Sequence, residues 1–208
     1  MMRTLALAAA LAVSLAACKQ DAATDASVTA TDPAPATSPT TEPATPPAAD
    51  ASGTPAVDAT SQSKFTGYGD MKLGSTVEEA KLAWAGELNG KPSEGSTCYY
   101  LSPKWVKQPS DFAFMVEEGK FVRYDVGTDK EAAPGGGKVG MATDALQALY
   151  GNGLQSAPHK YVEGGKTLSI AATDGSPGKL VFETDAAGKV TRWRVGVPPQ
   201  VDYVEGCS

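Results

Sequence analysis

Two stretches of the sequence share one pattern: GKFVRYDVG at 119–127 and GKVTRWRVG at 188–196. Each contains Gly-Lys, an apolar residue, an arginine, an aromatic residue and Val-Gly, and the two stretches start 69 positions apart. Because side chains alternate along a strand, the two aromatic residues would lie on one face of a sheet. The opposite face would then carry Arg123, Arg192 and Arg194.

A second pair of similar segments lies upstream of the first. KLGSTVE at 72–78 matches KVGMATD at 138–144, with an offset of 66. Two matches in the same order and at nearly the same offset indicate two copies of one unit. The sequence therefore predicts tandem units at about 65–133 and 134–208, within a globular domain at 63–208.

Each unit has the pattern of a short helix followed by a small antiparallel sheet. Ser75 and Glu78 have the spacing of a capping box, and apolar residues then recur on one helical face until Asn89-Gly90. A second helix is expected from Thr143. Strands are predicted at 97–101, 112–116, 121–126, 167–171, 180–184 and 190–195. These elements predict an α+β fold, in which two tandem helix-plus-meander units pack their helices on one face of the sheet.

The N-terminal part of the chain has a different composition from the rest. All fifteen aromatic residues lie between Phe65 and Tyr203. An apolar run at 5–15, preceded by Arg3, is typical of a secretory signal peptide and is too short to span a bilayer. Residues 19–62 are mostly Ala, Thr, Pro, Ser and Asp, so we expect a disordered tether. An O-glycosylated or wall-crossing stalk is the alternative.

The segment Leu15-Ala16-Ala17-Cys18 resembles the lipobox of bacterial lipoproteins. The resemblance implies a signal peptide at 1–17 and a lipidated Cys18, which starts the mature chain and its tether at 18–62. Acyl chains on Cys18 would hold the protein at a membrane surface of the cell envelope. Lys19 stands where inner-membrane lipoproteins often carry aspartate, so the resemblance favours the outer membrane. A secreted protein with an incidental cysteine at its cleavage site is the alternative.

The domain pattern is also similar to known families. An apolar residue, Gly, Ser or Met, a small residue and an acidic helix start, followed by a three-stranded meander, resemble small outer-membrane assembly lipoproteins of the BamE/SmpA type. The tandem duplication resembles the β-lactamase inhibitor protein, although this chain has one candidate disulfide where the inhibitor would have one in each unit. The domain is similar, too, to uncharacterised bacterial lipoproteins, some of which are labelled lectins. These resemblances imply architecture and no interface residue.

The cysteine count is consistent with export. If Cys18 is lipidated, Cys98 and Cys207 remain as an even pair, which favours a disulfide in an exported protein. Two separate buried thiols are the alternative.

The sequence contains none of the common catalytic or cofactor-binding motifs. It has no HExxH, no GxSxG, no P-loop and no GxGxxG between a strand and a helix. His159 is the single histidine, which excludes a site with several histidine ligands. We therefore expect neither an enzyme nor a metal or cofactor site. The net charge of −6, without a basic cluster, argues against nucleic-acid binding.

Two groups of residues are candidate binding sites. The first is the arginine face, on which guanidinium groups would bind carboxylates of an envelope protein. Solvated ion pairs with nearby acids such as Asp125 are the alternative. The second is the group of aromatic rings that could stack on a glycan: Tyr99, Tyr100 and Trp105.

Three functions are compatible with these sites. The first is a non-catalytic envelope binding protein, such as an inhibitor or immunity protein. The second is a carbohydrate-binding module, and the third is a scaffold for outer-membrane assembly. An exposed Trp105 beside Tyr99 or Tyr100 would favour a glycan ligand, whereas an open sheet lined by arginines would favour a protein partner.

Overall fold

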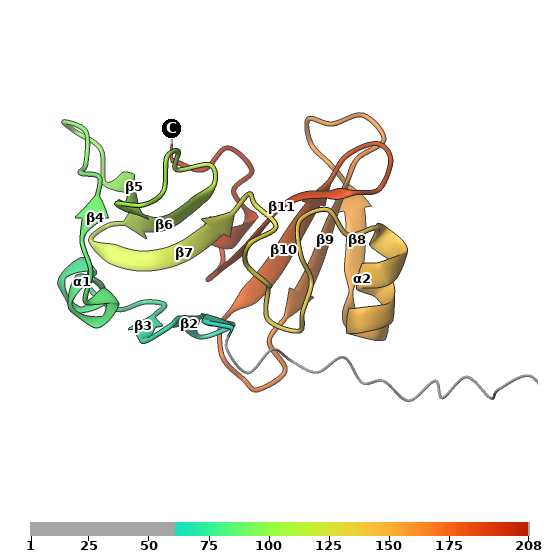
Figure 1. Ribbon diagram of the computed structural model, residues 1–208, viewed down its shortest axis with the longest axis horizontal. Helices are drawn as coiled ribbons and strands as arrows, with labels where there is room; N and C mark the ends of the chain where they lie inside the picture. Colours follow the sequence, from blue (N-terminus) through green and yellow to red (C-terminus); the bar gives the residue numbers. More distant parts are fainter. Residues whose placement is uncertain (1–60, 208) are drawn as a thin grey trace, which may run out of the picture. The chain divides into compact units, whose positions relative to one another are not determined.

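The computed structural model describes residues 61–207, which form a mostly β domain (Figure 1). The strands of this part make two antiparallel sheets. The smaller sheet has the order β1-β2-β3, and the larger has the order β4-β5-β6-β7-β11-β10-β9-β8. The expected signal peptide, Cys18 and all but the last two residues of the tether lie outside the described residues.

The bounds of the elements are β1 (Ser63–Lys64), β2 (Gly67–Tyr68), β3 (Met71–Lys72), α1 (Val77–Trp84), β4 (Leu88–Asn89), β5 (Cys98–Pro103), β6 (Phe112–Glu117), β7 (Lys120–Val126), α2 (Thr143–Tyr150), β8 (Gln155–Pro158), β9 (Lys166–Ala171), β10 (Lys179–Thr184) and β11 (Val190–Gly196). Two 3-10 helices complete the set, η1 (Gly151–Gly153) and η2 (Gln200–Asp202). All six predicted strands are confirmed, as β5, β6, β7, β9, β10 and β11. None of the helices between residues 61 and 207 is long and apolar enough to cross a bilayer.

The expected α+β class is wrong, because the helices are too short and too far apart to form a layer. Each helix has eight residues, and they lie at opposite ends of the domain (Figure 1). The buried residues of α1 are Val77 and Ala80, and α2 buries only Leu146. The strands contribute most of the buried apolar side chains, so the core belongs mainly to the sheet.

The start and the end of α1 also differ from the prediction. The capping box is made by Thr76 and Glu79, one residue after the expected pair. The helix stops at Ala85, which has a left-handed backbone with φ of 56° and donates its N–H to the carbonyl of Lys81. The apolar residues beyond it leave the helix, and Leu88 pairs with Pro103 at the edge of the large sheet.

The two strands with the shared pattern are neighbours at the centre of the large sheet. β7 and β11 pair with each other, and each forms a hairpin with the preceding strand, β6 or β10. An isolated bridge joins Thr76 to Lys120 in the first half of the domain, and the equivalent bridge joins Ala142 to Lys189 in the second. Matched segments of the sequence therefore occupy matched places around the centre of the sheet.

Aromatic side chains fill the core on one face of the sheet. Tyr124 and Trp193 are fully buried there and meet edge to face, with ring centroids 5.9 Å apart. The small sheet closes this core through Tyr68, whose ring centroid lies 4.9 Å from that of Phe112. The Tyr124 hydroxyl donates to the carbonyl of Lys64 at 2.9 Å, which ties β1 to β7.

The expected disulfide is confirmed. Cys98 at the start of β5 is bonded to Cys207, and their Cα atoms are 5.4 Å apart. The bond fastens the last part of the chain, residues 197–207, which is termed the C-terminal strap below. This strap contains η2, which contacts β7, β10 and β11.

Candidate functional site

The arginine side chains lie on the face of the sheet opposite the aromatic core. Arg194 is paired with Asp125 across β11 and β7, and Arg123 with Gly196. The prediction that these side chains share a face is confirmed, but the prediction that the face is open is wrong. Arg123 and Arg194 are each only 1% exposed. Arg192 alone is half-exposed, with 35% of its side chain accessible.

The C-terminal strap covers this face because its backbone carbonyls accept hydrogen bonds from the arginines. Arg123 Nη1 donates to the carbonyl oxygens of Gln200 at 2.9 Å and Tyr203 at 2.7 Å. Arg194 Nε donates to the carbonyl oxygen of Val201 at 2.6 Å. The strap has no partner in a β-ladder, and buried carbonyls need such donors. The guanidinium groups therefore serve as internal anchors for the strap.

Two buried carboxylates balance the buried arginines. Arg123 donates to Asp125 from Nε at 2.9 Å and from Nη2 at 2.7 Å, and Arg194 Nη1 donates to Glu183. Burial raises the pKa of Glu183, but Arg194 and then Arg192 outweigh it and leave that pKa below its ordinary value. Glu183 is thus engaged as an anion. These five side chains, Arg123, Asp125, Glu183, Arg192 and Arg194, are termed the arginine network.

Arg192 differs from the other two arginines of the network in its contacts. Its guanidinium makes no hydrogen bond to any residue in the described part of the chain. Its closest ion pairs are both long, at 3.9 Å from Nη2 to Asp125 Oδ1 and 3.9 Å from Nε to Glu183 Oε2. The carboxylates therefore position this guanidinium without occupying its donors.

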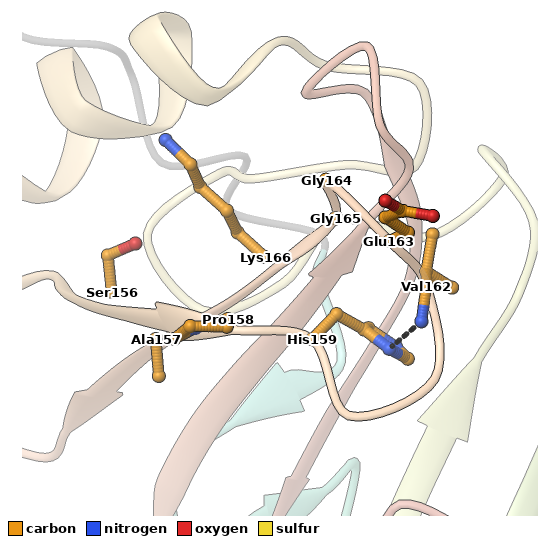
Figure 2. Close-up of a pocket in the computed structure, with 9 residues that line it drawn as sticks. All are labelled: Ser156, Ala157, Pro158, His159, Val162, Glu163, Gly164, Gly165 and Lys166. Atoms are coloured by element: carbon orange, nitrogen blue, oxygen red, sulfur yellow. Dashed lines mark hydrogen bonds between the residues drawn. The ribbon is translucent and has the colours of Figure 1, made fainter. Parts of the chain in front are cut away.

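A loop at 159–165, termed the His159 loop, borders the network on the β10 side. His159 Nε2 lies 3.4 Å from Glu183 Oε2. Its Nδ1 accepts from the backbone N–H groups of Tyr161 and Val162, each at 3.1 Å, and Figure 2 shows the second of these bonds. Two donors at Nδ1 place the imidazole proton on Nε2, where it faces the carboxylate. His159 therefore shapes the loop and joins it to the network.

A shallow hollow of about 380 Å³ lies on the outer side of the His159 loop. Figure 2 shows His159 and Val162 at one end of it, and Ser156 and Lys166 at the other. Its lining consists of Ser156, Ala157, Pro158, His159, Val162, Glu163, Gly164, Gly165 and Lys166. Residues 61–207 contain no group of three or more His, Cys, Asp or Glu side chains that could hold a metal ion.

The predicted aromatic cluster does not form one site. Tyr99 packs against the core, whereas the Tyr100 hydroxyl accepts from Arg123 Nη2 at 3.4 Å on the opposite face. Trp105 lies beyond the end of β5 and stacks on Phe112, with ring centroids 5.9 Å apart. Its other face is open, because 64% of the residue is exposed. Strand alternation places the two tyrosines on opposite faces of the sheet. The ring on which Trp105 stacks is that of Phe112 and not that of either tyrosine.

The sequence did not reveal an exposed apolar group on the His159 loop and the strap. Among the described residues, five large apolar side chains are exposed, and three of them are Tyr161, Val162 and Tyr203. The loop and the strap meet at Glu205, which accepts from the Tyr161 hydroxyl and pairs with Lys160 Nζ at 2.8 Å. These residues belong to no repeat, strand or motif, so no sequence pattern singled them out.

The comparisons with known proteins give no family. No family model matches the chain, and no curated protein matches it. Among solved structures, the chain is similar to an extracellular protein containing an SCP domain from Bacillus anthracis str. Ames, with 12% identity, a TM-score of 0.39 and coverage of 61% of this chain and 44% of that one. It is also similar to the uncharacterized protein yfeY from Escherichia coli, with 16% identity, a TM-score of 0.43 and coverage of 65% and 99%. The first match thus spans less than half of the B. anthracis chain.

Proposed function

We propose that this chain is a lipid-anchored protein of the bacterial cell envelope whose domain binds another envelope protein without catalysing a reaction. An inhibitor or an immunity protein is the kind of binder that this proposal describes. The observation that carries it is the surface formed by Arg192, Tyr161, Val162 and Tyr203, termed the Arg192 surface. It combines exposed rings with a half-buried guanidinium, and Tyr and Arg are enriched at the centres of protein interfaces.

The parts of the Arg192 surface are linked through the carboxylates of the arginine network. His159 and Arg192 approach the same oxygen, Glu183 Oε2, which relates the loop to Arg192. Arg123 and Arg192 likewise approach the same oxygen, Asp125 Oδ1, and Arg123 also holds the carbonyl of Tyr203. The loop and the strap are therefore both connected to Arg192 through the network, and the proposal is that a partner contacts the guanidinium together with the exposed rings.

A glycan ligand is the second candidate, and Trp105 favours it. Its ring is supported on one side by Phe112 and exposed on the other, which is the arrangement of a sugar-stacking platform. It is a single ring, whereas the Arg192 surface combines charge with several apolar side chains. Outer-membrane assembly is the third candidate, and it depends on the resemblance to BamE/SmpA-type lipoproteins alone.

The double variant Tyr161→Ser/Tyr203→Ser tests the proposed surface. We expect the yield of the partner captured from envelope extract to fall by roughly tenfold or more, because aromatic anchors supply most of the binding energy at interfaces. The matched control is Leu82→Ser, which alters an 82% exposed apolar residue on α1 and should leave capture unchanged. Equal capture by the wild type and both variants would contradict the proposal. Loss of capture only in Trp105→Ser would favour a glycan instead.

A separate variant tests the lipid anchor. Cys18→Ser should release the protein from membranes, because the proposal assigns its attachment to the acyl chains on that cysteine. The measurement is fractionation of cells after a high-salt wash. Lys19→Asp is the matched control, which should keep the protein at a membrane but shift it toward the inner-membrane fraction. A serine variant that still sediments with membranes would show that the lipobox interpretation is wrong.

A further inference from the structure

Arg192 carries hydrogen-bond donors that the fold leaves unused. A guanidinium has five N–H donors in a planar fork. Arg123 uses its donors on Asp125, Tyr100 and two strap carbonyls, and Arg194 uses Nε and Nη1 on the strap and on Glu183. Within residues 61–207, the Arg192 guanidinium donates no hydrogen bond, and its nearest carboxylate oxygens are 3.9 Å away. Its donors are therefore available to a ligand.

The arginine network also has one positive charge more than its carboxylates balance. It contains three guanidinium groups and two carboxylates. Asp125 is bonded by two nitrogens of Arg123, and Glu183 is bonded by Arg194. The salt bridges of the strap, Lys179 with Asp202 and Lys160 with Glu205, are each neutral as pairs. Within the network, the guanidinium that neither carboxylate bonds directly is thus that of Arg192, the arginine that solvent reaches, whereas the nearby carboxylate of Glu117 accepts from Gln200 of the strap.

The position of Arg192 suits one particular kind of anion. The two carboxylates, each 3.9 Å away, position the Arg192 guanidinium. A ligand that binds it therefore loses less side-chain entropy than it would on a freely moving arginine. The same carboxylates repel any anion that approaches, and the repulsion is larger for a phosphate dianion than for a carboxylate. A planar carboxylate also matches the guanidinium fork with two parallel hydrogen bonds.

We infer that Arg192 binds an aspartate or glutamate side chain of the partner protein through two hydrogen bonds, with Tyr161 and Tyr203 packing around that contact. This inference rests on the proposed function and adds the chemical class of the ligand. It also gives the three arginines separate roles. Arg123 and Arg194 hold the strap and the carboxylates, while Arg192 recognises the partner.

Arginine side-chain NMR tests the inference directly. The chain has four arginines, so its Nε–Hε spectrum is simple, and Arg123, Arg192 and Arg194 can each be assigned by substitution. Full-length ¹⁵N-labelled protein in detergent micelles is titrated with hexaglutamate peptide, hexaglutamine peptide and inorganic phosphate. We expect a saturable shift of the Arg192 signal with hexaglutamate, an affinity for phosphate that is lower by about fivefold or more, and no shift with hexaglutamine.

Two variants distinguish the contribution of the planar guanidinium geometry from that of its positive charge. Arg192→Gln should abolish the saturable response, and Arg192→Lys should weaken it by about tenfold, because lysine keeps the charge and loses the fork. Arg192→Lys should leave the denaturant midpoint of unfolding unchanged, because it keeps the charge beside Asp125 and Glu183, and Arg192→Gln should lower it only slightly, because both ion pairs are long and the side chain is 35% exposed. Hexaglutamate binding that survives Arg192→Gln, or phosphate binding as tight as that of hexaglutamate, would overturn the inference.

Capture of the envelope partner distinguishes failure of the inference from failure of the proposed function. We expect Arg192→Gln to reduce capture by roughly tenfold, as Tyr161→Ser/Tyr203→Ser does. If the tyrosine variant loses the partner and Arg192→Gln keeps it, the binding surface stands and the carboxylate inference is wrong. If both variants capture it as well as the wild type, the proposed function is wrong as well.

Discussion

Replacing Asp125 with alanine is expected to lower the free energy of unfolding by about 3–5 kcal/mol, which is the usual cost of removing one partner of a buried ion pair and leaving the other charge uncompensated. Asp125 is 1% exposed and accepts from both Nε and Nη2 of Arg123. Its removal leaves Arg123 charged, buried and without its main partner. The change is measured by urea unfolding, in which the midpoint should fall while the slope stays constant.

Two controls make this result specific. Asp129→Ala removes an exposed aspartate after β7, so it should change stability by only about 0.5 kcal/mol. Asp125→Ala combined with Arg123→Met removes both charges and should recover part of the loss, since a buried pair often contributes little over apolar residues of similar size. Recovery stays incomplete because the strap carbonyls of Gln200 and Tyr203 lose their donor. A loss below about 1 kcal/mol in the single variant would contradict the buried network.

The double variant Cys98→Ser/Cys207→Ser is expected to lose about 4–5 kcal/mol of stability in the chain-entropy model. The two cysteines are separated by 109 positions, so the bond closes a long loop and restricts the unfolded chain strongly. The strap should also open more often, because its end is then held by noncovalent contacts alone. Urea unfolding measures the first effect, and amide hydrogen exchange of residues 197–207 measures the second.

The wild-type protein provides the control for this experiment. After reduction with a dithiol it should match the double variant in stability and in exchange of the strap. Before reduction, its cysteines at 98 and 207 should resist alkylation, and unreduced peptides should show them linked. A double variant as stable as the oxidised wild type would mean that the strap holds the fold without its covalent bond.

Much of the sheet could be predicted from local patterns in the sequence. The strands β5, β6, β7, β9, β10 and β11 were found because a two-residue period and turn residues are properties of short segments. The same period placed the three arginines on one face. The disulfide followed from an even count of cysteines in a chain expected to be exported.

The fold class was not predictable in this way. The apolar run after Glu78 suits a helix as far as Leu88, but the helix ends at Ala85 and Leu88 joins β4. That choice depends on pairing with β5, in which the partner of Leu88 is Pro103, well beyond the helical segment itself. Helix length, and with it the balance between helices and strands in the core, therefore depended on a tertiary contact that the helical periodicity of the segment does not report.

The environment of each arginine depended on tertiary structure in the same way. Arg192 and Arg194 are two positions apart and point to the same face, yet the first reaches solvent and the second is buried. The difference comes from the strap and the His159 loop. Both are irregular segments, so their residues follow no periodic pattern from which their position could be predicted. Periodicity determines the face on which a side chain lies. The exposed part of that face depends on the strap. The strap is positioned by hydrogen bonds from the arginines to its backbone carbonyls and by a disulfide between residues 109 positions apart.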